Sequence, residues 1–464
     1  MHRFLVSAAH KSSGKTTLSV GLAAALARRG RAVQTYKKGP DYIDPLWLGL
    51  ASGRPCRNLD FHLSSGGEIA AAFARHGAAA EVCLVEGNKG LYDGLDLNGS
   101  NSNAALAKLL SLPVLLVLDA RGMTRGVAPL ILGYQAFDRA VRFAGVILNR
   151  LGGSRHESKL RAVIEHYTDV PVLGAVHAEA AIGITERHLG LIPANEAGAA
   201  AARIDAIAGA IERQVDIGKL LDATRAPAPL AAPAPERVAA SAAKLCVGIA
   251  RDRAFGFYYA GDLEALEAAG AKLAFFDALQ DAHLPEVDAL FIGGGFPECF
   301  GAELESNAGL RAQIRARIEG GMPVYAECGG LMYLSRSISW KGKRHAMVGA
   351  IPADVVVRER PTGRGYVVLE QTAAHPWPVG GAPEVRAHEF HYSTLENAAP
   401  SLVYAYRVKR GHGIDGERDG IVLRNVLASY THLRAAGGCD WPAQFVAFAQ
   451  RCRSPAREAG IGLR

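Results

Sequence analysis

The stretch Pro323-Val-Tyr-Ala-Glu-Cys-Gly-Gly-Leu-Met-Tyr-Leu334 predicts a buried strand, a sharp turn carrying a thiol, and the start of a helix. Amides at a helix N-terminus favour the thiolate form of a cysteine and can hold a developing oxyanion. Hydrolases with a serine nucleophile use the same strand–turn–helix geometry. A lone cysteine in such a turn is more often a small core residue. Here we interpret Cys328 as a nucleophile because the rest of the chain supplies the partners that such a thiol needs.

Length and composition set the broad class of the protein. A chain of 464 residues with 49% apolar residues predicts about two or three domains, each with a sizeable core. The net charge of +7 is spread along the chain, which argues against nucleic acid and is compatible with a nucleotide or a polyanionic small substrate. The seven cysteines include no Cys-x-x-Cys pair, so neither a disulfide framework nor a zinc site is favoured. No apolar run is long enough to span a membrane, and we expect a cytoplasmic enzyme with no membrane partner.

The N-terminal segment has the context of a phosphate-binding loop. A short apolar strand leads into Ala9-His-Lys-Ser-Ser-Gly-Lys-Thr-Thr17, and an apolar helical run follows. In such loops the amides around Gly14 to Thr17 bind phosphate, Lys15 reaches the outer phosphates, and the Thr16 hydroxyl can ligate Mg²⁺. The first glycine of the usual pattern is Ala9 here, so the context rather than the exact pattern carries this prediction. ATP and Mg²⁺ are therefore the expected cofactors.

Further polar residues follow predicted parallel strands of the same domain. Asp41 and Asp44 lie in the rigid loop Lys37-Lys-Gly-Pro-Asp-Tyr-Ile-Asp-Pro45, which could serve Mg²⁺ and a carboxylate substrate or be a charged surface turn. Glu86 ends a buried strand, where ligands bind in open α/β sheets, and is a candidate Mg²⁺ group. Asn149, at another strand end, is a candidate for the adenine edge. The alternation of strands and helices predicts a doubly wound parallel sheet.

A proline-rich segment divides the chain. Residues 223–243 include Ala-Pro-Ala-Pro-Leu-Ala-Ala-Pro-Ala-Pro, which predicts a semi-rigid linker between domains at 1–222 and 244–464. The second domain again alternates strands and helices. Its Gly293-Gly-Gly295 turn can expose backbone amides, as an oxyanion hole requires. His432, just past an apolar strand, suits a general base for the thiol, whereas we interpret His388 and His391 as packed structural residues.

Together these motifs resemble the cobyrinate (or hydrogenobyrinate) a,c-diamide synthases, a family of glutamine-dependent tetrapyrrole amidases. The resemblance implies an N-terminal ATP-dependent domain similar to dethiobiotin synthetase and a C-terminal class I glutamine amidotransferase domain. It implies Cys328 as nucleophile, His432 as its base, and amides near Gly295 and Gly329 as the oxyanion hole. Class I enzymes usually carry a glutamate two residues after the histidine; here the segment reads His432-Leu433-Arg434, and we name no third member. The motifs that carry the resemblance are residues 12–17, 38–45, 86–94, 147–150, 293–298, 326–334, 388–393 and 429–433.

The resemblance also implies a reaction. ATP would activate the a and c acetate carboxylates of a corrin as acyl phosphates, and ammonia from L-glutamine would convert them to amides. Asp41 and Tyr42 would lie near this polycarboxylate macrocycle, and Thr16, Asp44 and Glu86 near Mg²⁺. Siroheme, another sirohydrochlorin-derived tetrapyrrole, or the carboxylates used by cobyric acid synthase are alternatives with the same chemistry. A P-loop ATPase switch carrying an inert amidotransferase-like module is an alternative of another class. A homodimer is carried as an expectation only.

Overall fold

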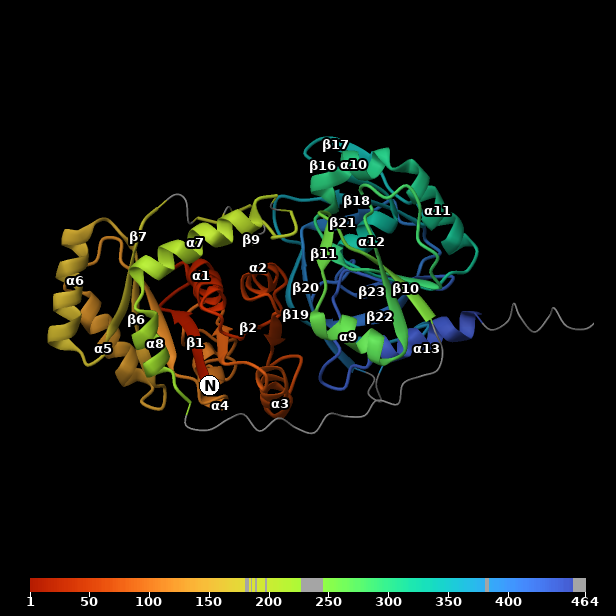
Figure 1. Cartoon of the computed structure of the whole chain (residues 1–464). Helices are drawn as coiled ribbons and strands as arrows, with labels where there is room; N and C mark the ends of the chain where they lie inside the picture. The colour runs from red at the N-terminus through yellow and green to blue at the C-terminus, as the bar shows by residue number, and fades with distance from the viewer. Residues whose placement is uncertain are drawn as a thin grey trace, which may run out of the picture. The chain divides into compact units, whose positions relative to one another are not determined.

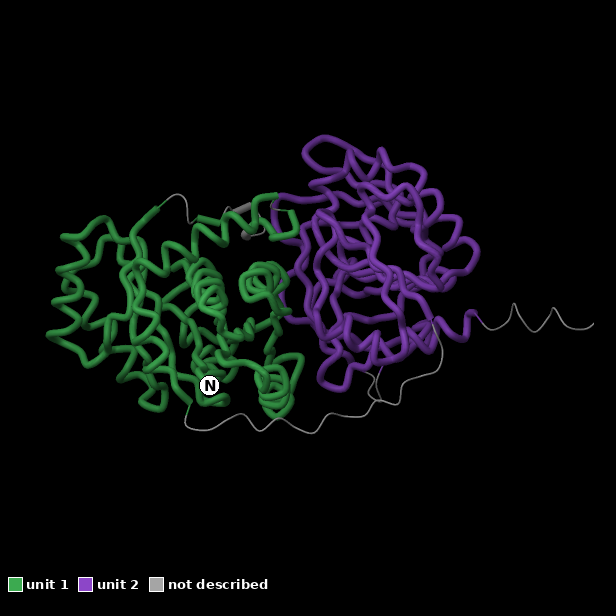
Figure 2. The backbone as a smooth tube through the Cα atoms, in the orientation of Figure 1, with its two compact units in different colours: residues 1–235 green, residues 236–464 purple. Residues whose placement is uncertain are grey.

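The computed structural model describes residues 1–453 except 180–182, 185, 188–189, 197, 227–244 and 380–383. The chain forms two compact units, Met1–Pro235 and Glu236–Arg464 (Figure 2). The division falls inside the predicted linker 223–243, nearly all of which lies outside the described residues. Within the described residues, no helix is both long and apolar enough to cross a bilayer.

The first unit is built on a seven-stranded sheet in which every pairing is parallel. The strand order is β3-β2-β4-β1-β5-β6-β7, so β4 lies between β1 and β2; Figure 1 labels β1, β2, β6 and β7 of this sheet. This register sets Val6 and Lys37 on either side of Glu86 at the carboxyl ends of their strands. The strands are β1 (His2–Ala8), β2 (Val33–Lys38), β3 (Arg57–Leu59), β4 (Val82–Glu86), β5 (Val114–Asp119), β6 (Phe143–Leu151) and β7 (Val172–His177).

Helices cover both faces of this sheet, because successive strand residues alternate between two separate apolar cores. One core holds α1 (Lys15–Arg28), α2 (Ile43–Ser52), α7 (Ala200–Gln214) and α8 (Ile217–Ala223). The other holds α3 (Gly66–Gly77), α4 (Asn103–Leu109), α5 (Val127–Phe137) and α6 (Ser154–Tyr167). A two-stranded hairpin, β8 (Glu186–Arg187) and β9 (Gly190–Leu191), completes the unit. The predicted doubly wound parallel fold is confirmed.

The second unit contains a nine-stranded mixed sheet of order β12-β10-β13-β15-β24-β23-β22-β19-β20. The first five strands pair in parallel and the remaining pairings are antiparallel. The strands are β10 (Leu245–Ala250), β12 (Ala271–Phe276), β13 (Ala289–Ile292), β15 (Val324–Glu327), β19 (Gly363–Gln371), β20 (Glu384–His391), β22 (Val403–Arg410), β23 (Arg418–Leu423) and β24 (Val426–Ser429). The predicted strand carrying the thiol is β15, at the centre of the sheet.

Two apolar cores again flank the sheet. Helices α9 (Ala260–Ala268) and α13 (Trp441–Arg453) pack on one face, and α10 (Gly301–Ser306), α11 (Ala308–Glu319) and α12 (Gly329–Leu334) pack on the other. A four-stranded sheet is formed by β16 (Ser335–Trp340), β17 (Lys343–Ala346), β18 (Ile351–Val357) and β21 (Ser393–Glu396). The short strands β11 (Phe255–Phe257) and β14 (Gly294–Gly295) pair, and a 3₁₀ turn spans Pro297–Phe300.

Candidate active sites

Cys328 lies at a tight turn between β15 and α12, with a left-handed φ of 48° and ψ of −99°. Its amide donates to the Ser429 carbonyl at 2.7 Å, and its carbonyl accepts from Met332 at 3.0 Å, so both neighbouring elements fix the turn. A non-glycine residue in this conformation stores about 1–3 kcal/mol of strain and persists only where the surroundings impose it. The side chain is buried but retains 7% exposure, as a nucleophile with an access path requires.

His432 lies beside this thiol because β15 and β24 are adjacent parallel strands. Glu327 and Ser429 end these strands in register, and the chain continues from each into the same region. The Cys328 side chain is close enough to the His432 imidazole to raise its pKa, and the thiol lies 4.0 Å from the Phe390 carbonyl oxygen. The imidazole is buried. A methyl group at Gly294 would lie 2.7 Å from its Cε1, so the absence of a side chain at Gly294 leaves room for the ring. The structure thus brings together the two residues that the sequence selects as nucleophile and base.

The electrostatics of this pair favour a charged imidazolium. Burial lowers the pKa of His432, but hydrogen bonds and charge interactions with Cys328 and Glu327 outweigh burial and raise it to about 10. An imidazolium beside a thiol stabilises the thiolate, which is the nucleophilic form of cysteine. The pair is therefore suited to attack on a carbonyl carbon.

Glu327 is a residue of this site that the sequence analysis did not select. Its Oε2 lies 3.3 Å from His432 Nδ1, and its Oε1 accepts from the Leu433 amide at 2.9 Å and the Tyr325 hydroxyl at 2.6 Å. Arg434, which occupies the position of the usual class I glutamate, instead places its guanidinium over the Tyr259 ring. The signal in the sequence was a carboxylate immediately before the nucleophile, where a buried strand would otherwise be apolar.

The candidate oxyanion hole consists of two adjacent backbone segments. A methyl group at Gly329 would lie 3.0 Å from the Gly295 amide nitrogen, so the two predicted residues are in contact across the turn. A methyl group at Gly330 would meet the Ile292 carbonyl at 2.1 Å. The glycines after Cys328 thus allow α12 to approach the end of β13 and bring Gly329 close to Gly295, and their role as an oxyanion hole stays a prediction.

The other two histidines singled out by the sequence have packing contacts. His388 exchanges backbone hydrogen bonds with His432, and their rings stack with centroids 4.9 Å apart. His391 stacks on Tyr430 at 4.0 Å, and its Nδ1 lies 3.0 Å from the Ser393 carbonyl. Both arrangements hold β20 against the segment that carries His432.

The predicted phosphate-binding loop joins β1 to α1. Gly14 has a φ of 89° and precedes the first helical residue, Lys15, while Thr16 and Thr17 are partly exposed in the first turn. Asn149 donates from Nδ2 to the Ser13 carbonyl at 2.8 Å, and a methyl group at Gly14 would lie 2.2 Å from that nitrogen. Asn149 therefore holds the loop itself, and its contact with adenine stays a prediction.

The predicted Mg²⁺ residues gather at the carboxyl ends of β1, β2 and β4. Thr16 Oγ1 donates to Glu86 Oε1 at 2.7 Å and to Asp44 Oδ2 at 3.2 Å. Lys37, which the sequence analysis did not assign to a site, is buried between them and lies 2.8 Å from Glu86 and 2.5 Å from Asp44. Its position follows from the sheet order, which sets β2 next to β4.

The pKa values of the ionisable groups in this cluster are shifted from their ordinary values. Burial raises the pKa of Glu86 to about 7, whereas the Lys37 ammonium and hydrogen bonds hold the pKa of Asp44 below its usual range despite burial. Burial lowers the pKa of Lys37, but the surrounding carboxylates outweigh it and raise the pKa well above its usual value. Burial and the nearby Lys37 charge lower the pKa of Lys15 to about 8. Such perturbations are typical of functional sites.

Asp41 and Tyr42, the predicted macrocycle contacts, lie at the start of α2. Asp41 Oδ1 accepts from the amides of Ile43 and Asp44 and so caps the helix, while its side chain retains 33% exposure. Burial raises the pKa of Asp41 to about 6. Tyr42 is 9% exposed. Their contact with a macrocycle stays a prediction.

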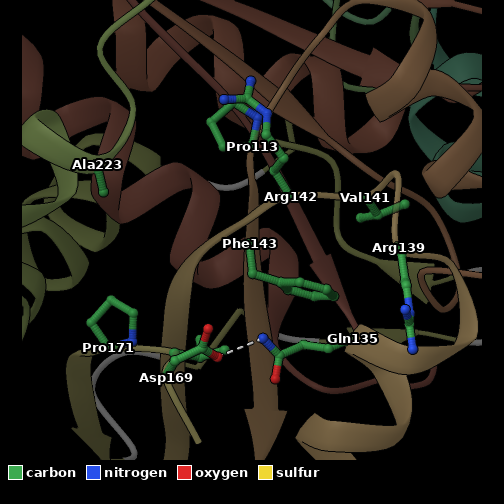
Figure 3. A pocket seen from close by; sticks show the side chains of 10 residues that line it. Pro113, Gln135, Arg139, Val141, Arg142, Phe143, Asp169, Pro171 and Ala223 are labelled. Atoms are coloured by element: carbon green, nitrogen blue, oxygen red, sulfur yellow. Dashed lines mark hydrogen bonds between the residues drawn. The ribbon is translucent and has the colours of Figure 1, made fainter.

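A separate pocket of about 460 Å³ lies at the opposite, amino-terminal edge of the first sheet. Figure 3 shows Gln135 and Asp169 hydrogen-bonded within it, beside Phe143 and Pro171 at the starts of β6 and β7. None of the predicted site residues lines this pocket, which is therefore separate from both candidate active sites.

Each unit matches a known domain family. Residues 5–191 match the CobQ/CobB/MinD/ParA nucleotide binding domain, and residues 246–438 match the CobB/CobQ-like glutamine amidotransferase domain. The alignment with a solved glutamine amidotransferase covers 44% of this chain and 98% of the solved chain, with 19% identity and a TM-score of 0.34. The two domain matches define a glutamine amidotransferase domain joined to a nucleotide-binding domain.

Relatives across the whole chain specify the family. A cobyrinate a,c-diamide synthase of Magnetococcus marinus is 46% identical over 445 residues, covering 95% of both chains. Enzymes of the same name from Archaeoglobus fulgidus and Methanosarcina acetivorans are 41% and 39% identical, each covering 93% of this chain and 94% and 92% of their own. The chain belongs to the cobyrinate a,c-diamide synthase family.

Proposed function

We propose that this chain is a carbon–nitrogen ligase that amidates the a and c acetate carboxylates of cobyrinate, using ATP and glutamine. The observation that carries the proposal is 46% identity over 95% of the chain to a cobyrinate a,c-diamide synthase, combined with the interacting Cys328–His432 pair. An inert amidotransferase-like module would have no need of a strained thiol beside a charged imidazole. The alternative of a simple ATPase switch is therefore disfavoured.

In the second unit, the Cys328 thiolate attacks the side-chain amide carbon of glutamine. The oxyanion that forms accepts hydrogen bonds from the Gly295 and Gly329 amides. His432 gives its proton to the departing nitrogen, so that ammonia leaves and a thioester remains. His432 then takes a proton from water, which attacks the thioester and releases glutamate and the thiolate.

In the first unit, a carboxylate of the macrocycle attacks the γ-phosphorus of ATP, and ADP leaves. The product is an acyl phosphate. This activation is needed because a free carboxylate is a poor electrophile with a poor leaving group. Ammonia attacks this carbonyl carbon and phosphate departs, giving the amide. The Gly14–Thr17 amides and the Lys15 ammonium hold the phosphates, and Lys37 supplies a buried positive charge beside them. Two rounds amidate both acetates.

The donor set at the strand ends fits Mg²⁺. Thr16, Asp44 and Glu86 offer oxygen atoms, and Glu86 Oε2 is buried without a hydrogen-bond partner among the described residues. Mg²⁺ prefers few protein oxygens together with phosphate and water, so this small set suffices. When bound here, the ion neutralises charge on the transferring phosphate.

The test compares Cys328→Ser with Cys246→Ser, the same change at a cysteine on β10 of the same unit. Glutamine-dependent amidation and glutaminase activity should be lost in the first variant and kept in the second. Amidation supported by added ammonium should survive in both, because the first unit is untouched. Glutaminase activity in Cys328→Ser would refute the nucleophile assignment.

A further inference from the structure

The Cys328–His432 site has a histidine but lacks the carboxylate that class I amidotransferases place two residues after it. We propose that Glu327 fills this role as a positioning residue, which orients the His432 imidazole and stabilises its charged form. The inference rests on the proposed function of Cys328 and His432. It assigns the third position of the site to the residue directly before the nucleophile.

The contacts of Glu327 fix its carboxylate in one orientation. Tyr325 Oη and the Leu433 amide both donate to Oε1, leaving Oε2 aimed at His432 Nδ1 at 3.3 Å. A carboxylate only accepts hydrogen bonds, so Nδ1 must carry a proton. The nitrogen left for the thiol is Nε2. Glu327 thereby sets both the tautomer and the ring orientation of His432.

The backbone of Cys328 makes this arrangement possible. In an extended strand, consecutive side chains point to opposite faces, so Glu327 and Cys328 could not both reach one ring. The left-handed φ of 48° at Cys328 breaks this alternation at the end of β15. The carboxylate lies against Nδ1, and the thiol interacts with the same imidazole. The strained turn thus allows both Glu327 and Cys328 to approach the same imidazole.

Three other charged residues of this unit, Asp419, Asp262 and Arg434, have contacts with groups other than the His432 ring. Asp419 accepts from the amides of Tyr430, Thr431 and Gly420, and Asp262 accepts from the Ala435 amide and the Trp441 indole. Arg434 lies over Tyr259. Among the described residues, Cys328 and Glu327 act on the charge of the His432 ring, and His388 stacks on it. Glu327 is the carboxylate that reaches it.

The experiment compares Glu327→Gln with Glu389→Gln in the full-length enzyme. Both side chains are buried, with 3% and 2% exposure, and Glu389 also accepts backbone amides, from His412 and Gly413. The readouts are glutaminase kcat and KM, ammonium-dependent amidation, and the pH midpoint for alkylation of Cys328 by iodoacetamide. Alkylation needs no substrate, so it separates this inference from the proposed function.

Glu327→Gln should lower glutaminase kcat about 10²- to 10⁴-fold with little change in KM, as loss of an orienting carboxylate does in related sites. The alkylation midpoint should move to higher pH, because the imidazolium that supports the thiolate loses its partner. Glu389→Gln should keep the wild-type midpoint. An unchanged midpoint in Glu327→Gln would overturn the proposal even if kcat falls, since the effect would then be structural.

A second measurement decides the question if Glu327→Gln does not fold. Cys328→Ala removes the thiol and leaves Glu327 facing His432, so the variant isolates the effect of the carboxylate on the ring. The titration of His432 in this variant is followed by NMR with ¹⁵N-labelled histidine. The proposal predicts that the pKa of His432 stays above 6.5, because the carboxylate still favours the charged ring. A pKa at or below 6.5 would mean that burial dominates and would overturn it.

Discussion

Gly294→Ala tests whether the position of the His432 ring controls the thiol chemistry. Gly294 lies in β14, and an added methyl group would sit 2.7 Å from His432 Cε1. Ordinary contact begins at 3.4 Å, so the ring must retreat by 3.4 − 2.7 = 0.7 Å. Gly294 is not among the residues with a positive φ, so its backbone accepts alanine.

The expected effect follows from this displacement. A misplacement of about 1 Å can cost about 10²-fold in rate, so a shift of 0.7 Å should lower glutaminase kcat between about 10- and 100-fold. This corresponds to about 1.4–2.7 kcal/mol in the activation free energy. Amidation supported by ammonium should be unchanged, because that chemistry lies in the other unit.

Gly261→Ala provides the matched control. Gly261 lies in α9 of the same unit, and a methyl group there would have no atom within 4 Å. Alanine in this helix should leave glutaminase activity at the wild-type level and stabilise the fold slightly. Wild-type glutaminase kcat in Gly294→Ala would refute the reasoning, since the ring could then move without affecting the reaction.

Three further predictions follow from the two sites. Lys15→Ala should abolish amidation while keeping glutamine hydrolysis, and product formation by this variant at the wild-type rate would contradict the role of the loop. Thr16→Val, which removes the hydroxyl bonded to Glu86, should raise the Mg²⁺ concentration needed for half-maximal amidation, whereas Thr16→Ser should not; equal Mg²⁺ curves would argue against a metal site here. The folded-state pKa of His432 is raised from 6.5 to about 10, so its protonation contributes stability that is fully present below pH 6.5 and is lost as pH rises through about 10. Urea unfolding between these pH values should therefore show a smaller pH slope in His432→Asn than in the wild type, and identical slopes would contradict the raised pKa.

The sequence predicted the main features of the fold, and it selected Cys328 and His432, two residues that the structure brings together. Continuous apolar strands such as β1 predict a buried parallel sheet, which occurs in the first unit, while β15 lies in the parallel part of the mixed second sheet. The Cys328 turn was predictable because two glycines must follow a nucleophile that packs so close to a neighbouring strand end. His432 was predictable because it directly follows an apolar strand.

The residues missed depend on which strands are neighbours. Lys37 meets Glu86 because β2 pairs with β4, and Glu327 meets His432 because β15 pairs with β24. The spacing of residues along the sequence does not show which strands pair. Asn149 donates to the Ser13 carbonyl, a contact that also depends on the fold, and its predicted contact with adenine stays a prediction.

The most direct test of the central claim is the product mass after incubating the enzyme with ATP, Mg²⁺, glutamine and each of cobyrinate, hydrogenobyrinate, sirohydrochlorin and siroheme. Each carboxylate converted changes the mass by the difference between OH and NH₂, which high-resolution spectrometry separates. We expect two conversions on cobyrinate. Conversion of siroheme alone, or of no macrocycle while glutaminase activity is intact, would contradict the assigned substrate.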